Sequence, residues 1–255
     1  KNWKIKDVKK NLIKELQNKI GDKRVMIGVS GGVDSMVAAT LLHEAIGDNL
    51  YCVFIDTGLM RKNEGRQVQA LFKSLQFSNF TAVEASTEFL IKLEGIVDPE
   101  EKRKTFATVY FQIFSKQASE LKKYKHIDFL AQGTIYPDRI ETGKASKMAD
   151  AIKTHHNLYT PQKFDMELLE PLGEFYKDEV RALGLELGIR KDSVYRHPFP
   201  GPGLAIRILG EITYERLTLL RESDSIFIEE LKQSGWIDKT WQAFAALLPI
   251  KSVGV

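Results

Sequence analysis

The stretch Ser30-Gly31-Gly32-Val33-Asp34-Ser35 has the residue types needed to hold a phosphate group. It follows an apolar run at 25–29 that predicts a strand, and it opens a run of apolar residues at helical spacing that ends near residue 46. Two adjacent glycines allow consecutive backbone N–H groups to turn toward one anion. The first turn of the helix adds unpaired N–H groups and partial positive charge. Hydroxyls of Ser30 and Ser35 add donors, and the carboxylate of Asp34 suits Mg²⁺.

This loop is not a Walker A motif, because no lysine precedes its second serine. The simpler interpretation is a Gly-Gly turn between a strand and a helix. The whole six-residue motif, in its strand-to-helix context, favours a phosphate-binding loop.

The elements that must position this loop alternate between strand-like and helix-like runs. That alternation is typical of a parallel sheet with helices on both faces, so we expect an α/β fold. Asp56, Gln132 and Gly133 follow predicted strands, at the sheet edge where ligands of open α/β sheets bind. For Asp56, a turn before Thr57-Gly58 is an equally good interpretation. The predicted strands are 25–29, 50–55, 80–85, 127–131 and 168–171, and the predicted helices are 34–46, 64–75, 100–124 and 176–187.

Two later segments interrupt this alternation. Residues 142–163 are polar and aperiodic, which predicts a lid. The proline-rich run 197–203 predicts a boundary between domains at 1–196 and 197–255. Beyond it we expect a small α+β domain, with a strand at 204–209 and helices at 214–233 and 241–247. Both ends of the chain are interpreted as cuts in a longer protein.

Composition narrows the class of protein. Hydrophobic residues at 43% and charged residues at 28% are typical of a globular chain. The net charge of +3 is too small to indicate nucleic-acid binding, but it suits a site for phosphates. Cys52, within an apolar run, predicts a buried thiol and a reducing compartment. No apolar run approaches the roughly 20 residues that span a bilayer, so we expect a cytoplasmic protein with no membrane partner.

Six segments give the chain a close resemblance to the GMP synthetase family. The SGGVDS loop is shared with all N-type ATP pyrophosphatases, whereas the HHN and RHPFPGPG segments are narrower signals. The chain resembles the family's ATP-pyrophosphatase part followed by the beginning of its dimerisation domain. The matching segments are 28–35, 53–59, 98–104, 131–138, 152–157 and 196–203.

The resemblance implies ATP-dependent amination of xanthosine 5′-monophosphate (XMP) to GMP, with ATP and Mg²⁺ as cofactors. An oxygen of XMP would attack the α-phosphorus of ATP, and ammonia would then displace AMP. It implies that Asp34 holds the metal, that Asp34 and Lys153 are catalytic, and that Arg103 and Arg196 bind XMP. The implied ATP-binding residues are Ser30, Gly31, Gly32, Val33, Asp34, Ser35, Asp56, Gln132 and Gly133.

His155 and His156 are expected to belong to the lid. Adjacent residues do not face one metal site, so a zinc pair is the weaker interpretation. Without the resemblance, Lys153 would be interpreted as an ordinary solvated lysine.

Partners follow from what the chain lacks. Buried Cys52 cannot serve as a glutaminase nucleophile, so ammonia must be free or supplied by a glutamine amidotransferase domain or subunit. The residues after Gly203 bury too little surface alone, which predicts a homodimer. Three alternatives remain: an NAD synthetase, a tRNA-thiolating pyrophosphatase, and a nucleotide sensor without catalysis.

Overall fold

The computed structural model describes residues 4–144 and 166–250. The chain folds as two compact units made of segments far apart in the sequence. Described residues of the first unit fall within 1–55, 68–83 and 111–196, and those of the second within 56–67, 84–110 and 197–255. Most of the predicted lid lies outside the described residues, and so do Lys153, His155 and His156.

The first unit is built on a five-stranded sheet within the described residues, in the order β3-β2-β1-β4-β5. β1 pairs in parallel with both β2 and β4, and β4 pairs in parallel with β5. The α/β fold with a parallel sheet is therefore confirmed. The strands are β1 (Val25–Val29), β2 (Leu50–Asp56), β3 (Phe80–Glu84), β4 (Phe129–Ala131) and β5 (Glu167–Leu169).

Burial along the strands follows their positions in the sheet. β2 is buried at every residue from Leu50 to Ile55, as expected of a strand covered on both faces. β3 is one of the two edge strands of this sheet, and Thr81 and Ala82 within it are exposed. β4 and β5 each have three residues, fewer than the sequence pattern predicted.

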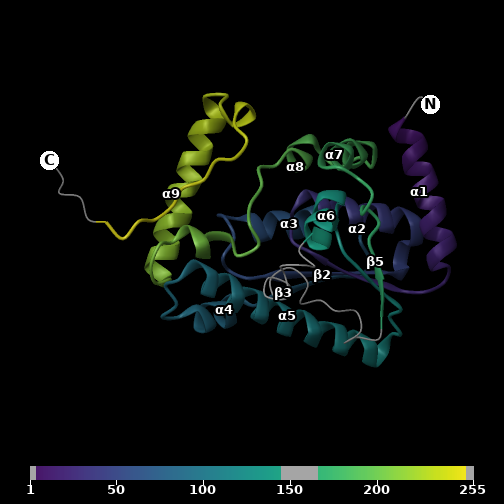
Figure 1. Cartoon of the computed structure of the whole chain (residues 1–255), viewed down its shortest axis with the longest axis horizontal. Coiled ribbons are helices and arrows are strands. Elements are labelled where there is room, and N and C mark those ends of the chain that lie inside the picture. The colour runs from purple at the N-terminus through teal and green to yellow at the C-terminus, as the bar shows by residue number, and fades with distance from the viewer. Residues whose placement is uncertain (1–3, 145–165, 251–255) are drawn as a thin grey trace. The chain divides into compact units, whose positions relative to one another are not determined.

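Helices cover this sheet on both sides. α1, α2 and α7 pack against one another, and Figure 1 shows α2 and the part of α5 after residue 110 on opposite sides of the strands. α1 was not predicted, although buried Leu16 and Ile20 give it an apolar face. α6 contains residues 142–144, so the predicted lid cannot begin at 142. The helices of this unit are α1 (Ile5–Ile20), α2 (Val33–Ile46), η1 (Gly47–Asn49), α3 (Glu64–Ser74) from Val68, α5 (Pro99–Tyr124) from Phe111, α6 (Tyr136–Lys144), α7 (Lys177–Glu186) and α8 (Lys191–Val194).

The second unit is mainly helical in its described part. It contains α4 (Ser86–Leu93), residues 99–110 of α5, η4 (Gly203–Arg207), α9 (Tyr214–Gln233) and η5 (Ile237–Lys239). Local signals start its helices: the Asp98 carboxylate accepts the N–H of Glu101 at the start of α5, and the Thr213 hydroxyl accepts the N–H of Arg216 at the start of α9. The predicted helix at 214–233 is confirmed.

Two predictions for this unit are wrong. Residues 204–209 do not form a strand, because Gly203–Arg207 is a 3₁₀ helix and pairing is limited to one bridge between Ile208 and Leu247. Residues 241–247 are not helical. Carbonyl groups of the 205–211 segment accept hydrogen bonds from lysine and arginine side chains, which replaces the strand pairing that their apolar sequence suggested. Among the described residues, none of the helices combines the length and apolarity needed to cross a membrane.

Candidate nucleotide-binding site

The predicted phosphate loop joins β1 to α2, as its sequence indicated. Gly32 is extended, with φ −72° and ψ 152°, and α2 begins at Val33. The Oγ of Ser35 accepts the N–H of Ser30 at 3.2 Å and donates to the carbonyl of Gly32 at 3.1 Å. The Oγ of Ser30 lies 3.4 Å from the nitrogen of Gly32. Both serine hydroxyls therefore shape the loop, beside the N–H groups at the start of α2.

Position 31 requires a glycine because of both its backbone conformation and its surroundings. Its φ of 76° lies in the left-handed region, and a Cβ there would approach the Cγ2 of Val68 to 2.5 Å. Nη1 of Arg196 donates to the Gly31 carbonyl at 3.2 Å. This contact places Arg196 at the phosphate loop, and its binding of XMP stays a prediction.

Gly133 lies directly against the start of α2. A Cβ on Gly133 would lie 2.8 Å from the nitrogen of Ser35 and 2.9 Å from the carbonyl carbon of Asp34. The neighbouring Gln132 donates its N–H to the Leu169 carbonyl at 2.9 Å. β1 and β4 are adjacent in the sheet, whereas the chain runs from β1 to β2 on the other side. The two loops thus meet at the switch point of the sheet, where α/β folds bind ligands.

Asp34 has a partner that the sequence analysis missed. Nζ of Lys177 lies 2.8 Å from Oδ1 and 2.6 Å from Oδ2 of Asp34. Lys177 is the first residue of α7, whose start is fixed by the Glu179 carboxylate accepting the N–H of Tyr176 at 2.8 Å. The sequence feature that could have identified Lys177 is its position soon after β5, because the segments that follow parallel strands lie at one edge of the sheet.

The donor set at the loop suits a metal ion that arrives with a nucleotide. Among residues 4–144 and 166–250, no group of three or more His, Cys, Asp or Glu side chains could hold a metal. Mg²⁺ is commonly held by one or two carboxylates, with phosphate oxygens and water completing its shell. Asp34, with a side chain 28% exposed at the start of α2, fits that role.

Two other predicted site residues belong to the second unit. Asp56 ends β2, and its Oδ1 accepts the N–H of Gly58 at 3.1 Å, which is the turn that the sequence left open. A Cβ on Gly65 would come within 2.1 Å of the Asp56 Oδ2. Arg103, on α5, forms an ion pair with Glu100. Nucleotide contact by Asp56 and XMP contact by Arg103 stay predictions.

Cys52 is buried in β2, which confirms the predicted structural thiol. Burial raises the pKa of this thiol well above its usual range. The thiolate is the nucleophilic form of cysteine, so Cys52 is not an activated nucleophile.

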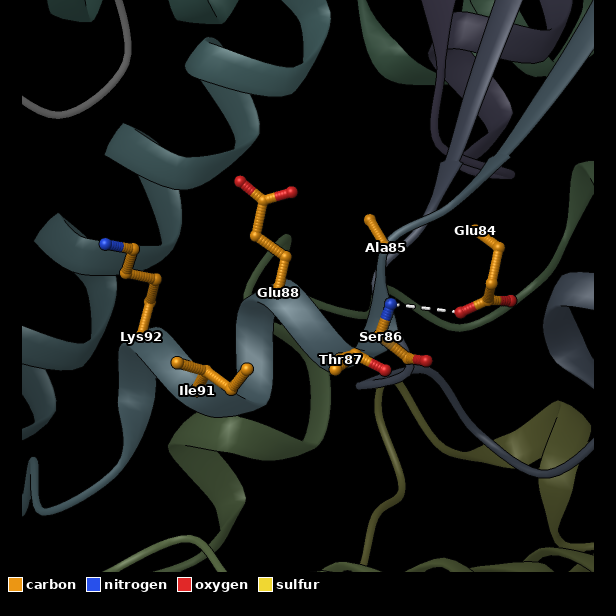
Figure 2. Close-up of a pocket in the computed structure, with 7 residues that line it drawn as sticks. All are labelled: Glu84, Ala85, Ser86, Thr87, Glu88, Ile91 and Lys92. Carbon is orange, nitrogen blue, oxygen red and sulfur yellow. Dashed lines mark hydrogen bonds between the residues drawn. The ribbon is translucent and has the colours of Figure 1, made fainter.

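A separate cavity of about 460 Å³ lies in the second unit, at the start of α4. Figure 2 shows Glu88 and Lys92 extending from the same face of that helix, and Glu84 accepting the N–H of Ser86 at 3.0 Å. None of its seven lining residues was predicted as a site residue, and we assign the cavity no function.

Known proteins similar to this chain support the sequence resemblance. A family model described as NAD synthase matches residues 5–103. Three proteins named GMP synthase [glutamine-hydrolyzing] are similar over nearly the whole chain. The one from Petrotoga mobilis is 49% identical over 99% of the chain, that from Nitrosomonas eutropha 51% over 99%, and that from Thermotoga petrophila 50% over 100%. The chain spans only about half the length of these relatives, namely 50%, 49% and 50%.

Solved structures show the same fold at low sequence identity. An NH3-dependent NAD synthetase from Campylobacter jejuni aligns with a TM-score of 0.55 and 17% identity, over 92% of each chain. An NMN synthetase from Francisella tularensis aligns with a TM-score of 0.56 and 16% identity, over 98% of this chain and 100% of its own. The chain therefore has the same fold as these two synthetases, and its sequence is similar to the three GMP synthases over nearly its whole length.

Proposed function

We propose that this chain is the ATP-pyrophosphatase part of a GMP synthase and that it aminates XMP. The observation that supports this most strongly is about 50% identity to GMP synthases over nearly the whole chain. The phosphate loop at the switch point of the sheet gives that similarity a physical basis. ATP and Mg²⁺ are the proposed cofactors, and ammonia is the proposed nitrogen source.

The first half-reaction forms a bond between an XMP oxygen and the α-phosphorus of ATP, and pyrophosphate leaves. The loop N–H groups and the helix end would stabilise the charge that develops on this leaving group. Mg²⁺ held by Asp34 would supply additional charge neutralisation when bound. In the second half-reaction ammonia attacks the activated carbon of the base, and AMP leaves with the electron pair of the broken carbon–oxygen bond.

Lys177 is the residue that we add to this site. Its ammonium group contacts the carboxylate of Asp34. Asp34 belongs to the first turn of α2, the helix that would face the phosphates. A cation and Mg²⁺ repel each other when both contact one carboxylate. We infer that Lys177 moves to a phosphate oxygen when Mg²⁺ and ATP bind. It would then supply the positive charge that the loop sequence lacks.

Replacing Lys177 with methionine tests this role. We expect the variant Lys177→Met to lower the rate of pyrophosphate release by about a hundredfold, because a cation on the leaving group is lost. Lys9 is the matched control, because its Nζ lies 2.8 Å from Oε1 of Glu44, which belongs to α2 as Asp34 does. Lys9→Met should keep the rate of pyrophosphate release within about twofold. The same loss should appear when Lys177→Met is added to Asp34→Asn. No further loss there would mean that Lys177 serves only to hold Asp34.

The partners and the lid remain part of the proposal. A glutamine amidotransferase domain or subunit would supply ammonia, as the words "glutamine-hydrolyzing" in the names of the relatives suggest.

A homodimer is supported by exposed apolar side chains of the second unit, which include Leu219, Ile226, Trp236 and Trp241. Lys153, His155 and His156 would close over the substrates. A cytoplasmic location stays a prediction.

One assay tests the reaction. The purified chain, given ATP, Mg²⁺, XMP and ammonium, should form AMP, pyrophosphate and GMP in equal amounts. Glutamine in place of ammonium should give no GMP, because Cys52 is buried and inert. GMP made from glutamine by the chain alone would contradict the assignment of the nitrogen source.

A competing substrate and a measurement of ATP binding separate two of the alternatives, the NAD synthetase and the nucleotide sensor. The match to the NAD synthase family model makes deamido-NAD the appropriate competing substrate. NAD formation without GMP formation would replace the proposal with an NAD synthetase. Tight ATP binding without turnover on either substrate would indicate a nucleotide sensor.

A further inference from the structure

Lys102 is a fully buried lysine on α5, and its side chain takes no part in the site described above. It is 1% exposed and lies in the first turns of the helix, where its own N–H bonds to the Asp98 carbonyl. A buried ammonium group is costly unless its three donors are all used. Lys102 Nζ donates to three backbone carbonyls, those of Ala205 at 3.2 Å, Ile208 at 2.7 Å and Gly210 at 2.5 Å.

These three oxygens form a carbonyl cage at the end of the 3₁₀ helix η4. Carbonyl groups at a helix end have no partner within the helix. Arg216 donates to two neighbouring carbonyls, those of Leu209 at 2.7 Å and Glu211 at 2.5 Å. Burial lowers the pKa of Lys102, and the charge of Arg216 lowers it further. The ammonium group of Lys102 and the guanidinium group of Arg216 thus bind backbone carbonyl oxygens of the 205–211 segment. Carbonyl oxygens coordinate a potassium ion in the same way, by surrounding its positive charge.

The next residue on the helix is Arg103. Its side chain is 46% exposed, and its charge is paired with Glu100 on the same turn. Successive helical side chains differ in direction by a fixed angle, so anchoring Lys102 fixes the rotation of this part of α5. The direction of the Arg103 side chain is fixed with it.

We propose that Lys102 is a positioning residue for XMP, because its ammonium fills the carbonyl cage and so holds Arg103 in its binding direction. This inference rests on the proposed function and on the predicted contact of Arg103 with XMP. Lys102 and the three carbonyl groups lie within the second unit, and the Lys102 side chain is buried. Their contacts therefore do not require a partner chain on the surface of this unit.

Steady-state kinetics with each substrate test the proposal. Lys102→Met should raise the KM for XMP by about tenfold and leave the KM for ATP within about twofold, since displaced binding groups weaken only the ligand they contact. The control is Lys116→Met, which removes the same charge from an exposed position on α5 and should change neither constant. Equal changes in both constants, or no change, would overturn the positioning role.

Cation rescue tests the carbonyl cage itself. Lys102→Ala removes the ammonium and leaves three carbonyl oxygens, so K⁺ should raise its unfolding temperature and lower its KM for XMP. Li⁺, which is smaller, should do neither, and wild type and Lys116→Ala should respond equally to both salts. An equal response of Lys102→Ala to K⁺ and Li⁺ would overturn the cage, even if Lys102→Met fails to fold. Wild type that forms no GMP would instead refute the proposed function, and this inference with it.

Discussion

The variant Asp34→Asn should lose pyrophosphate release by about a hundredfold or more, with its fold intact. Asparagine keeps the shape of the side chain and one oxygen acceptor, but it removes the charge that would hold Mg²⁺ at the start of α2. In the protein without nucleotide, the same change also leaves Lys177 without its carboxylate partner. Initial rates of pyrophosphate release at several Mg²⁺ concentrations measure the effect.

Glu44 provides a matched control on the same helix. It pairs with Lys9 of α1 at 2.8 Å, as Asp34 pairs with Lys177 of α7. Glu44→Gln should therefore cost the protein one ion pair and leave the rate within about twofold. Turnover by Asp34→Asn that reaches the wild-type rate at saturating Mg²⁺ would remove Asp34 from the metal site.

The variant Gly203→Ala should be among the most destabilising single changes in the second unit. Gly203 has φ 60°, and a Cβ there would lie 2.2 Å from the Leu59 carbonyl oxygen. That oxygen also accepts the N–H of Leu204 at 2.7 Å, so the backbone cannot move away without losing a hydrogen bond. We expect a loss of about 3 kcal/mol in the free energy of unfolding, measured by urea denaturation.

Gly235 separates the backbone conformation from the clash. Its φ of 70° is similar, but a Cβ at Gly235 would meet nothing within 4 Å. Gly235→Ala should therefore cost only the left-handed conformation, about 1 kcal/mol. Equal losses for the two variants would show that the close approach of Gly203 to Leu59 contributes nothing.

Local sequence signals predicted much of the first unit. The strand at 25–29, the glycine-rich loop and the following helix depend on residues adjacent in the chain, and the structure has all three within one residue of the prediction. The buried run at 50–55 was equally clear, because a central parallel strand is apolar at every position. The short strands β4 and β5 were predicted too long, since an apolar run does not show where pairing stops.

The second unit shows where such signals fail. The apolar residues 204–209 suggested a strand, yet a strand needs a pairing partner, and Lys102 and Arg216 take carbonyls of the 205–211 segment instead. Lys102 lies about a hundred residues earlier in the chain, within a charged run that reads as an exposed helical face. Its burial could not be predicted from that run.

By itself, the sequence determined the α/β class, the glycine-rich loop between β1 and α2 and the resemblance to the GMP synthetase family, because each depends on residue types at short spacing. Only the tertiary structure decided which distant side chains complete the site. Lys177 reaches Asp34 across 143 positions because β5 and β1 both lie beside β4, so the segments that follow them emerge at one edge of the sheet. Contacts of that kind depend on strand order, which no local pattern specifies.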